Sequence, residues 1–148
     1  MELIEKKSDE LTFSVKTEDS LANAIRRYFN KIPIMAVEHV DIHKNDSPLF
    51  DETIAHRIGL IPFKMEKKSK YSDSYELELD VTGEPIVYSG DLKGKIKPVH
   101  EKIPITTLNK SQNLKISAKV TSGLGEEHSK YSPGLMFYRH LVEITADK

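Results

Sequence analysis

The stretch SLANAIRRYFNKIPIMAVEHVDI, residues 20–42, joins an amphipathic helix directly to a strand. At about 100° per residue, one set of helix side chains falls inside an arc of about 140°. The apolar set consists of Leu21, Ala24, Ile25, Tyr28 and Phe29, and the polar set that points away from it consists of Asn23, Arg26, Arg27 and Asn30. Two interpretations stay open. The apolar stripe either packs on the protein's own sheet beside solvated arginines, or docks onto a partner.

The residues around this stretch predict the neighbouring elements. Alternation of apolar and polar side chains predicts a strand at residues 11–15. Asp19 is expected to cap the first helix, because its carboxylate can accept hydrogen bonds from free backbone donors. The helix is expected to end at residues 30–32, ahead of Pro33. The β-branched and apolar residues that follow predict a strand at 34–42.

The rest of the sequence predicts one more helix and several strands. A loop at residues 43–48 leads to a helix at 51–58, with Gly59 expected in a left-handed conformation at its end. Period-two patterns predict strands at residues 75–81, 114–120 and 135–144, and a hairpin between residues 86–88 and 95–99. The expected fold class is therefore α+β, with a mixed or antiparallel sheet and a few helices.

Composition limits the chemistry that the chain can perform. The 148 residues include 22 Lys plus Arg and 23 Asp plus Glu, so no global positive field draws nucleic acid. Cysteine is absent, which excludes disulfides, iron-sulfur clusters and cysteine-ligated zinc. We expect no cofactor and no metal.

Several histidines and serines are candidates for catalytic or ligand residues. His39 and His43 are four apart, but on a predicted strand that spacing does not create a helical ligand pair. The segment GLGEE, residues 123–127, lacks the lysine of a phosphate loop and predicts a tight turn. His128 and Lys130 stand near Ser132, yet no third orienting group is identifiable. We expect no catalytic residue.

Three blocks of the sequence resemble one known family. Residues 20–42 are followed by NDSPLFDETIAHRIGLIPF, residues 45–63, and later by GLGEEHSKYSPGLMFYRHLVEI, residues 123–144. In this order they resemble the alpha-like assembly subunits of cellular RNA polymerases, the group that includes the archaeal D subunits. Many archaeal members carry a cysteine-ligated cluster domain, which this sequence cannot form.

The resemblance implies a division into lobes. Residues 1–45 would form the N-terminal half of a dimerisation lobe, residues 46–144 an insert lobe, and residues 145–148 a tail. The family continues with the C-terminal half of the dimerisation lobe, and by the resemblance this half would be absent from the chain. The resemblance therefore suggests a separate chain as the supplier of that half, with a self-dimer as the fallback and a shortened subunit as the alternative.

The resemblance also implies a function. The chain would be a non-catalytic assembly platform of DNA-directed RNA polymerase, a nucleotidyltransferase. The apolar stripe, Leu21, Ala24, Ile25, Tyr28 and Phe29, would form the dimer interface with a small alpha-like polymerase subunit of the L type. Arg27, and less directly Arg26, would contact a large catalytic subunit. DNA would be met only indirectly, through the polymerase.

Two other functions stay open. A stand-alone interaction or regulatory module could use the same fold, and a nucleic-acid-binding protein could use the basic segment at Lys64, Lys67, Lys68 and Lys70. The N-terminal residues MELIEKKSDE contain no apolar core of signal-peptide length, and no run of apolar residues is long enough to span a membrane. These features predict a cytoplasmic protein.

Overall fold

The computed structural model describes residues 1–65 and 73–142, which form two compact units. One unit contains residues 1–29 together with the segment from residue 134 onward, and the other contains residues 30–133. Helices and antiparallel strands occur together, so the α+β class is confirmed. No helix within the described ranges has the length and apolar character needed to cross a membrane.

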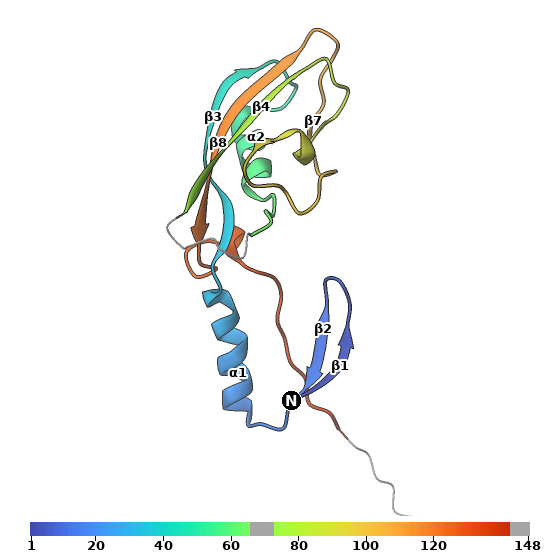
Figure 1. Ribbon diagram of the computed structural model, residues 1–148, viewed down its shortest axis with the longest axis vertical. Coiled ribbons are helices and arrows are strands. Elements are labelled where there is room, and N and C mark those ends of the chain that lie inside the picture. The colour runs from blue at the N-terminus through green and yellow to red at the C-terminus, as the bar shows by residue number, and fades with distance from the viewer. Residues whose placement is uncertain (66–72, 143–148) are drawn as a thin grey trace, which may run out of the picture. The chain divides into compact units, whose positions relative to one another are not determined.

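The smaller unit combines a hairpin with a helix (Figure 1). Strand β1 (Glu2–Lys6) pairs antiparallel with β2 (Leu11–Ser14), which agrees with the predicted strand at 11–15. Helix α1 (Asp19–Tyr28) follows and continues into the 3-10 turn η1 (Phe29–Lys31), as expected for a helix that stops before Pro33. The strand predicted at 135–144 is not present in residues 135–142, because no neighbouring backbone pairs with them in the described structure.

The larger unit is built on a four-stranded antiparallel sheet in the order β3-β8-β4-β6. Its long strands are β3 (Ile34–Asn45), β4 (Ser74–Thr82) and β8 (Asn113–Gly123), with the short β6 (Lys93–Gly94) at one edge. The alternation predicted for β4 and β8 is confirmed, since their apolar side chains are buried or half-buried and none of their polar side chains is buried. Strand β3 continues to Asn45, into the region expected to be a loop, because it pairs with β8 over its whole length.

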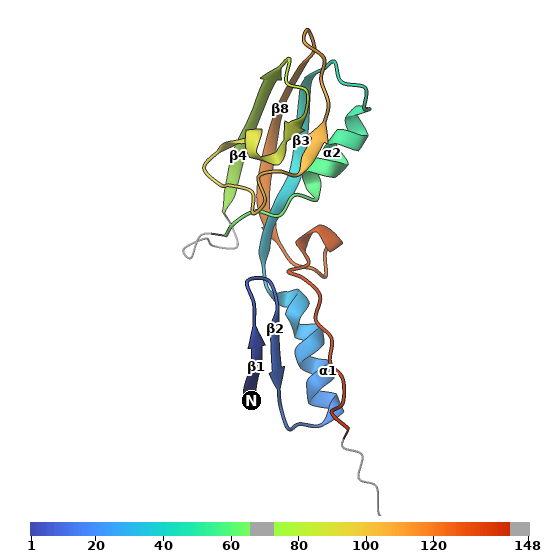
Figure 2. The ribbon, with the colours of Figure 1, turned by 90° about the vertical axis from the view of Figure 1, so that its right-hand side faces the viewer.

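Helix α2 (Asp51–Gly59) covers one face of this sheet (Figure 2). Ile54 and Ile58 are fully buried and pack into a core with Leu77, Leu79 and Leu114. The predicted helix is confirmed, but its predicted end is wrong. Gly59 is the last residue of the helix, and its φ is not positive. The cap residue is Leu60, whose N–H donates to the carbonyls of Arg57 and Ile58.

The predicted hairpin between residues 86–88 and 95–99 is wrong. Strand β5 (Val87–Tyr88) pairs with β7 (Pro104–Thr106), and β6 pairs with β4. The 3-10 turn η2 (Ser89–Asp91) explains the longer connection. The Ser89 hydroxyl donates to the His100 carbonyl at 2.6 Å and accepts from the Ile103 N–H at 3.2 Å. These two bonds stabilise the segment that connects β5 to β7.

The unit boundaries differ from the lobe boundaries that the resemblance implied. The expected division fell near residues 45 and 144, whereas the units divide after residues 29 and 133. Strand β3 lies in the larger unit because it pairs with β8 from Ile34 to Asn45, with register shifts at Glu38 and His43. The assignment of these units to a dimerisation lobe and an insert lobe stays a prediction.

Candidate functional site

Helix α1 carries every residue of the predicted interface except Phe29, which follows it in η1. Asp19 is the first helical residue rather than the cap. Glu18 occupies the cap position in an extended conformation, and its backbone carbonyl, not a side chain, accepts the N–H groups of Leu21 and Ala22. The Asp19 carboxylate still lies in the first turn, where it complements the helix dipole.

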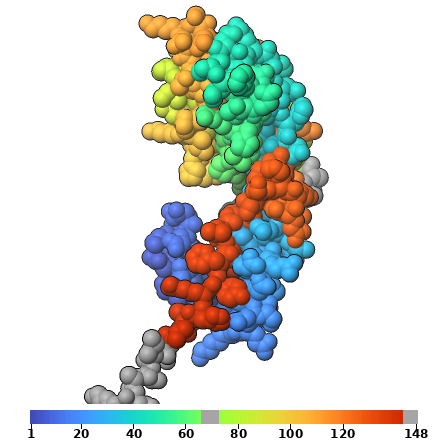
Figure 3. All heavy atoms as spheres, turned by 180° about the vertical axis from the view of Figure 1, so that it is seen from behind, coloured from blue at the N-terminus to red at the C-terminus, as the bar shows by residue number. Residues whose placement is uncertain are grey.

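The apolar stripe of α1 is poorly covered by its own unit. No residue of α1 is buried, and the exposed fractions are 54% for Leu21 and 68% for Tyr28. Ile25 and Phe29 are half-buried, and Ala24 is exposed. Residues 134–142 lie beside α1 in the same unit (Figure 3), and His140 approaches Asp19 at 3.5 Å. The stripe therefore keeps apolar surface that a partner could cover.

The two arginines of α1 are both exposed but differ in their contacts. Arg26 is tied to its own helix, because its Nε and Nη2 atoms donate to Asn23 Oδ1 at 3.2 and 2.9 Å. Arg27 forms no hydrogen bond or ion pair with the residues that the structure describes. The N–H donors of its guanidinium group are therefore available for hydrogen bonds with another molecule.

The larger unit contains a polar pocket that the sequence did not predict. It has a volume of about 390 Å³ and is lined by Glu38, Thr121, Ser122, Glu127, His128, Lys130 and Tyr131. Glu38 comes from β3, and Lys130 and Tyr131 come from the 3-10 turn η3 (Ser129–Tyr131).

Glu38 is the centre of the hydrogen bonds in this pocket. Lys130 Nζ donates to Glu38 Oε2 at 2.8 Å and to the Val37 carbonyl at 3.1 Å. The Tyr131 hydroxyl donates to the same carboxylate oxygen at 2.5 Å. Because that hydroxyl proton is used, Thr121 Oγ1 is the donor in its 2.9 Å bond to the Tyr131 oxygen. These bonds fasten η3 to β3 and β8.

The same contacts shift two pKa values. Hydrogen bonds from Lys130 and then Tyr131 lower the pKa of Glu38, because both stabilise the charged carboxylate. Burial, followed by the hydrogen bond to Glu38, raises the pKa of Tyr131 to about 12. Tyr131 therefore stays protonated and keeps donating at neutral pH. The Glu38 carboxylate, the Lys130 amine and the Tyr131 phenol use their hydrogen-bonding groups on one another, an arrangement suited to holding η3 in place.

We expect Glu38→Gln to reduce the free energy of unfolding of the chain by about 1 kcal/mol at neutral pH, a modest value because the Glu38 side chain is 54% exposed. Since the folded state lowers the pKa of Glu38, its contribution is present above the unfolded value and is lost as pH falls through the folded value. Urea unfolding at several pH values from neutral to acidic should show that the free energies of unfolding of the wild type and the Glu38→Gln variant become equal in acid. Glu78→Gln, at an exposed position of β4, is the control. A difference that persists unchanged in acid would contradict this account.

The glycine at the end of β8 is required by this arrangement. A Cβ atom on Gly123 would lie 2.6 Å from ring carbons of Tyr131, closer than packed atoms approach. The predicted turn at residues 123–127 is confirmed, and the Leu124 N–H donates to Glu127 Oε2 at 3.1 Å. Glu38 and Lys130 are 92 positions apart in the sequence, so no local pattern could have linked them.

The histidines do not converge. His39 Nε2 lies 3.1 Å from Asp41 Oδ1, whereas His43 Nε2 lies 2.8 Å from Ser117 Oγ. Within residues 1–65 and 73–142, no three His, Asp or Glu side chains gather closely enough to hold a metal ion. Lys67, Lys68 and Lys70 of the predicted basic segment lie outside the described residues.

Comparison with known proteins identifies the family to which the chain is similar. The family model for the RNA polymerase Rpb3/RpoA insert domain matches residues 29–136. This range nearly coincides with the larger unit, residues 30–133.

Archaeal proteins named DNA-directed RNA polymerase subunit Rpo3 are similar along the chain. The protein of Thermococcus kodakarensis is 38% identical over 99% of this chain and 61% of its own length. The protein of Pyrococcus furiosus is 38% identical over 100% of this chain and 61% of its own length. The protein of Methanocaldococcus jannaschii is 37% identical over 91% of this chain and 71% of its own length. The chain thus spans about three fifths of the first two relatives. It belongs to the family of RNA polymerase alpha-like subunits that contain the Rpb3/RpoA insert domain, the family of archaeal Rpo3.

Proposed function

We propose that this protein is a non-catalytic assembly-platform subunit of DNA-directed RNA polymerase. The observation that carries the proposal is an apolar stripe left uncovered on α1, in a chain whose archaeal relatives are named as subunits of this enzyme. The protein would contribute surfaces rather than reacting groups. The polar groups of the Glu38 pocket support this view, because they bind one another and fasten a turn.

The first surface would bind a small alpha-like subunit of the L type. Leu21, Ala24, Ile25, Tyr28 and Phe29 would pack against a similar helix of that partner. Burial of their apolar area would contribute about 25 cal/mol per Å², from which the cost of association is subtracted. The partial exposure of Leu21 and Tyr28 supports this role, since side chains already in a core would gain nothing from a partner.

The second surface would contact a large catalytic subunit through Arg27. A planar guanidinium group with five donors suits a carboxylate or backbone carbonyls of a partner. Arg26 is less suited, because two of its nitrogens already donate to Asn23.

We expect Arg27→Ala to leave the pair with the small subunit intact and to weaken recruitment of the large subunit about 10-fold, a typical loss for an arginine at an interface centre. Stepwise reconstitution, with the affinity of each step measured separately, checks this result. Ser20→Ala, on the same helix, is the matched control. Recruitment of the large subunit at wild-type affinity would remove Arg27 from the interface.

Affinity capture from native cells tests the function as a whole. The tagged chain should bring down a small alpha-like subunit and the large polymerase subunits, and the complex should synthesise RNA from a DNA template. The free chain should show no such activity. Capture of other proteins without any polymerase subunit would favour the stand-alone interaction module instead.

A further inference from the structure

A segment of the larger unit gathers lysines that have no acidic partner among the described residues. They are Lys64, Lys93, Lys95, Lys97 and Lys102, together called the lysine strap, and all five are exposed. Five other described lysines, Lys7, Lys31, Lys44, Lys115 and Lys130, form ion pairs, whereas Lys6, Lys16, Lys110 and Lys119 form none with a described carboxylate and are scattered along the sequence. No lysine of the strap forms an ion pair with a described carboxylate.

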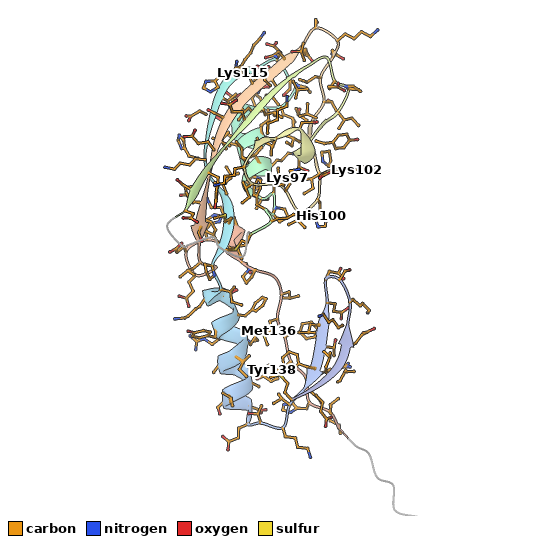
Figure 4. All side chains as sticks on the ribbon, in the orientation of Figure 1. Lys97, His100, Lys102, Lys115, Met136 and Tyr138 are labelled. Atoms are coloured by element: carbon orange, nitrogen blue, oxygen red, sulfur yellow. The ribbon has the colours of Figure 1, made fainter. Side chains whose placement is uncertain are left out.

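One backbone hydrogen bond joins the two sequence segments of the strap, and contacts with β4 fix two of its other lysines. The Lys64 N–H donates to the Lys97 carbonyl at 2.9 Å, which brings residue 64 beside the later segment. Lys93 is paired through its backbone with Glu78 of β4, and Lys95 Nζ lies 5.5 Å from the centre of the Tyr75 ring. In the view of Figure 4, Lys97, His100 and Lys102 project onto the same part of the larger unit, whereas Lys115 projects onto another part of it.

The strap is a local exception in a nearly neutral protein. The whole chain has a net charge of −1, whereas residues 91–102 hold four lysines against Asp91 and Glu101. Asp91 is directed into its own turn, because its carboxylate accepts the Tyr88 N–H at 2.7 Å. Lys93 acts on the Asp80 carboxylate only through its charge, as Asn113 and Lys115 bind that group directly. Lys93 also stands opposite the exposed Glu78 in the ladder, so its charge is partly balanced within the protein. The charges of Lys64, Lys95, Lys97 and Lys102 are not used in ion pairs with described carboxylates and are available to an external anion.

We propose that the lysine strap binds the phosphate backbone of nucleic acid. Leu92, Ile96 and Pro98 are buried, whereas Val99, between Lys97 and Lys102, is 41% exposed and Met65, next to Lys64, is 39% exposed. The strap therefore presents five charges with only two partly exposed apolar side chains beside them. A protein partner usually adds apolar or aromatic anchors to its charges. Phosphates need only point charges, which lysines supply without a demanding geometry. This inference does not depend on the polymerase assembly proposed above.

The test measures binding of a fluorescent single-stranded DNA of about 20 nucleotides to the full chain over about 50–200 mM salt. Contacts from five lysines predict a slope of log affinity against log salt near −3.5, or a loss of about 100-fold across this range. Replacing all five strap lysines by glutamine should bring the slope close to zero. Replacing them by arginine should preserve it, because the charges remain.

A control variant changes the net charge equally at other exposed positions. It carries glutamine at Lys6, Lys16, Lys110, Lys115 and Lys119. It should keep the wild-type slope. Equal losses in the control and strap variants, or loss of the slope in the arginine variant, would overturn the proposal. So would competition by an acidic peptide of matched charge that equals competition by unlabelled DNA, since the strap would then fit an acidic protein segment.

Discussion

Replacing Ile25 by aspartate is expected to abolish pairing with the small alpha-like subunit. Ile25 lies at the centre of the apolar stripe, where partner contact would strip water from the introduced carboxylate. Burying an unpaired charge costs several kcal/mol, and each 1.4 kcal/mol is about tenfold in affinity. We therefore expect a loss of at least about 100-fold, measured by capture of the small subunit on the immobilised full chain.

Two further variants separate pairing from folding. Ile25 is half-buried within its own unit, so its replacement also removes some internal packing. Leu21 is 54% exposed, and Leu21→Asp should weaken pairing without that complication. Asn23→Asp adds the same charge on the opposite face of α1 and should pair normally. If the Ile25 and Leu21 variants capture the small subunit as well as wild type does, the stripe serves only its own unit.

Periodicity predicted the elements whose burial decides their conformation. In β4 the alternation of Leu77 and Leu79 with glutamates matches the structure, because both leucines are fully buried and every second residue faces water. The stripe on α1 was visible for the same reason, at the helical period. Burial of one face leaves a pattern within a few residues, so it can be read from the sequence.

Pairing between distant strands left no such pattern. Residues 86–88 were followed by turn residues, which predicted a hairpin with residues 95–99. The structure pairs β5 with residues 104–106 instead, and the buried Ser89 hydroxyl holds the intervening loop. A turn signal shows where the chain bends but not which segment it meets, because that choice depends on the packing of the whole core.

The Glu38 pocket was missed for a related reason. Its carboxylate lies on β3, while its donors come from η3 near the other end of the larger unit's sequence. Both Glu38 and Lys130 look like ordinary surface residues in the sequence. Only the close approach of η3 to β3 gives the lysine a side-chain exposure of 15% and a fixed partner.

The substitution Gly94→Ala is expected to lower the free energy of unfolding of the chain by about 1–3 kcal/mol, the usual range for an overpacked core. A Cβ atom at residue 94 would lie 2.5 Å from Leu77 Cδ2 and 2.6 Å from the Glu76 carbonyl oxygen. Leu77 is fully buried, and the backbone of Glu76 belongs to β4, which β8 holds on its other side. Neither neighbour can move away without disturbing the sheet.

Gly59→Ala is the matched control, because the same added methyl group would meet no atom within 4 Å at the end of α2. Alanine is the better helix former, so this variant should be unchanged or stabilised by up to about 1 kcal/mol. Urea unfolding of the two variants and wild type, followed by circular dichroism, measures both effects. Equal stability of the Gly94 and Gly59 variants would mean that β6 does not pack against Leu77 as described, and that this edge of the sheet is open.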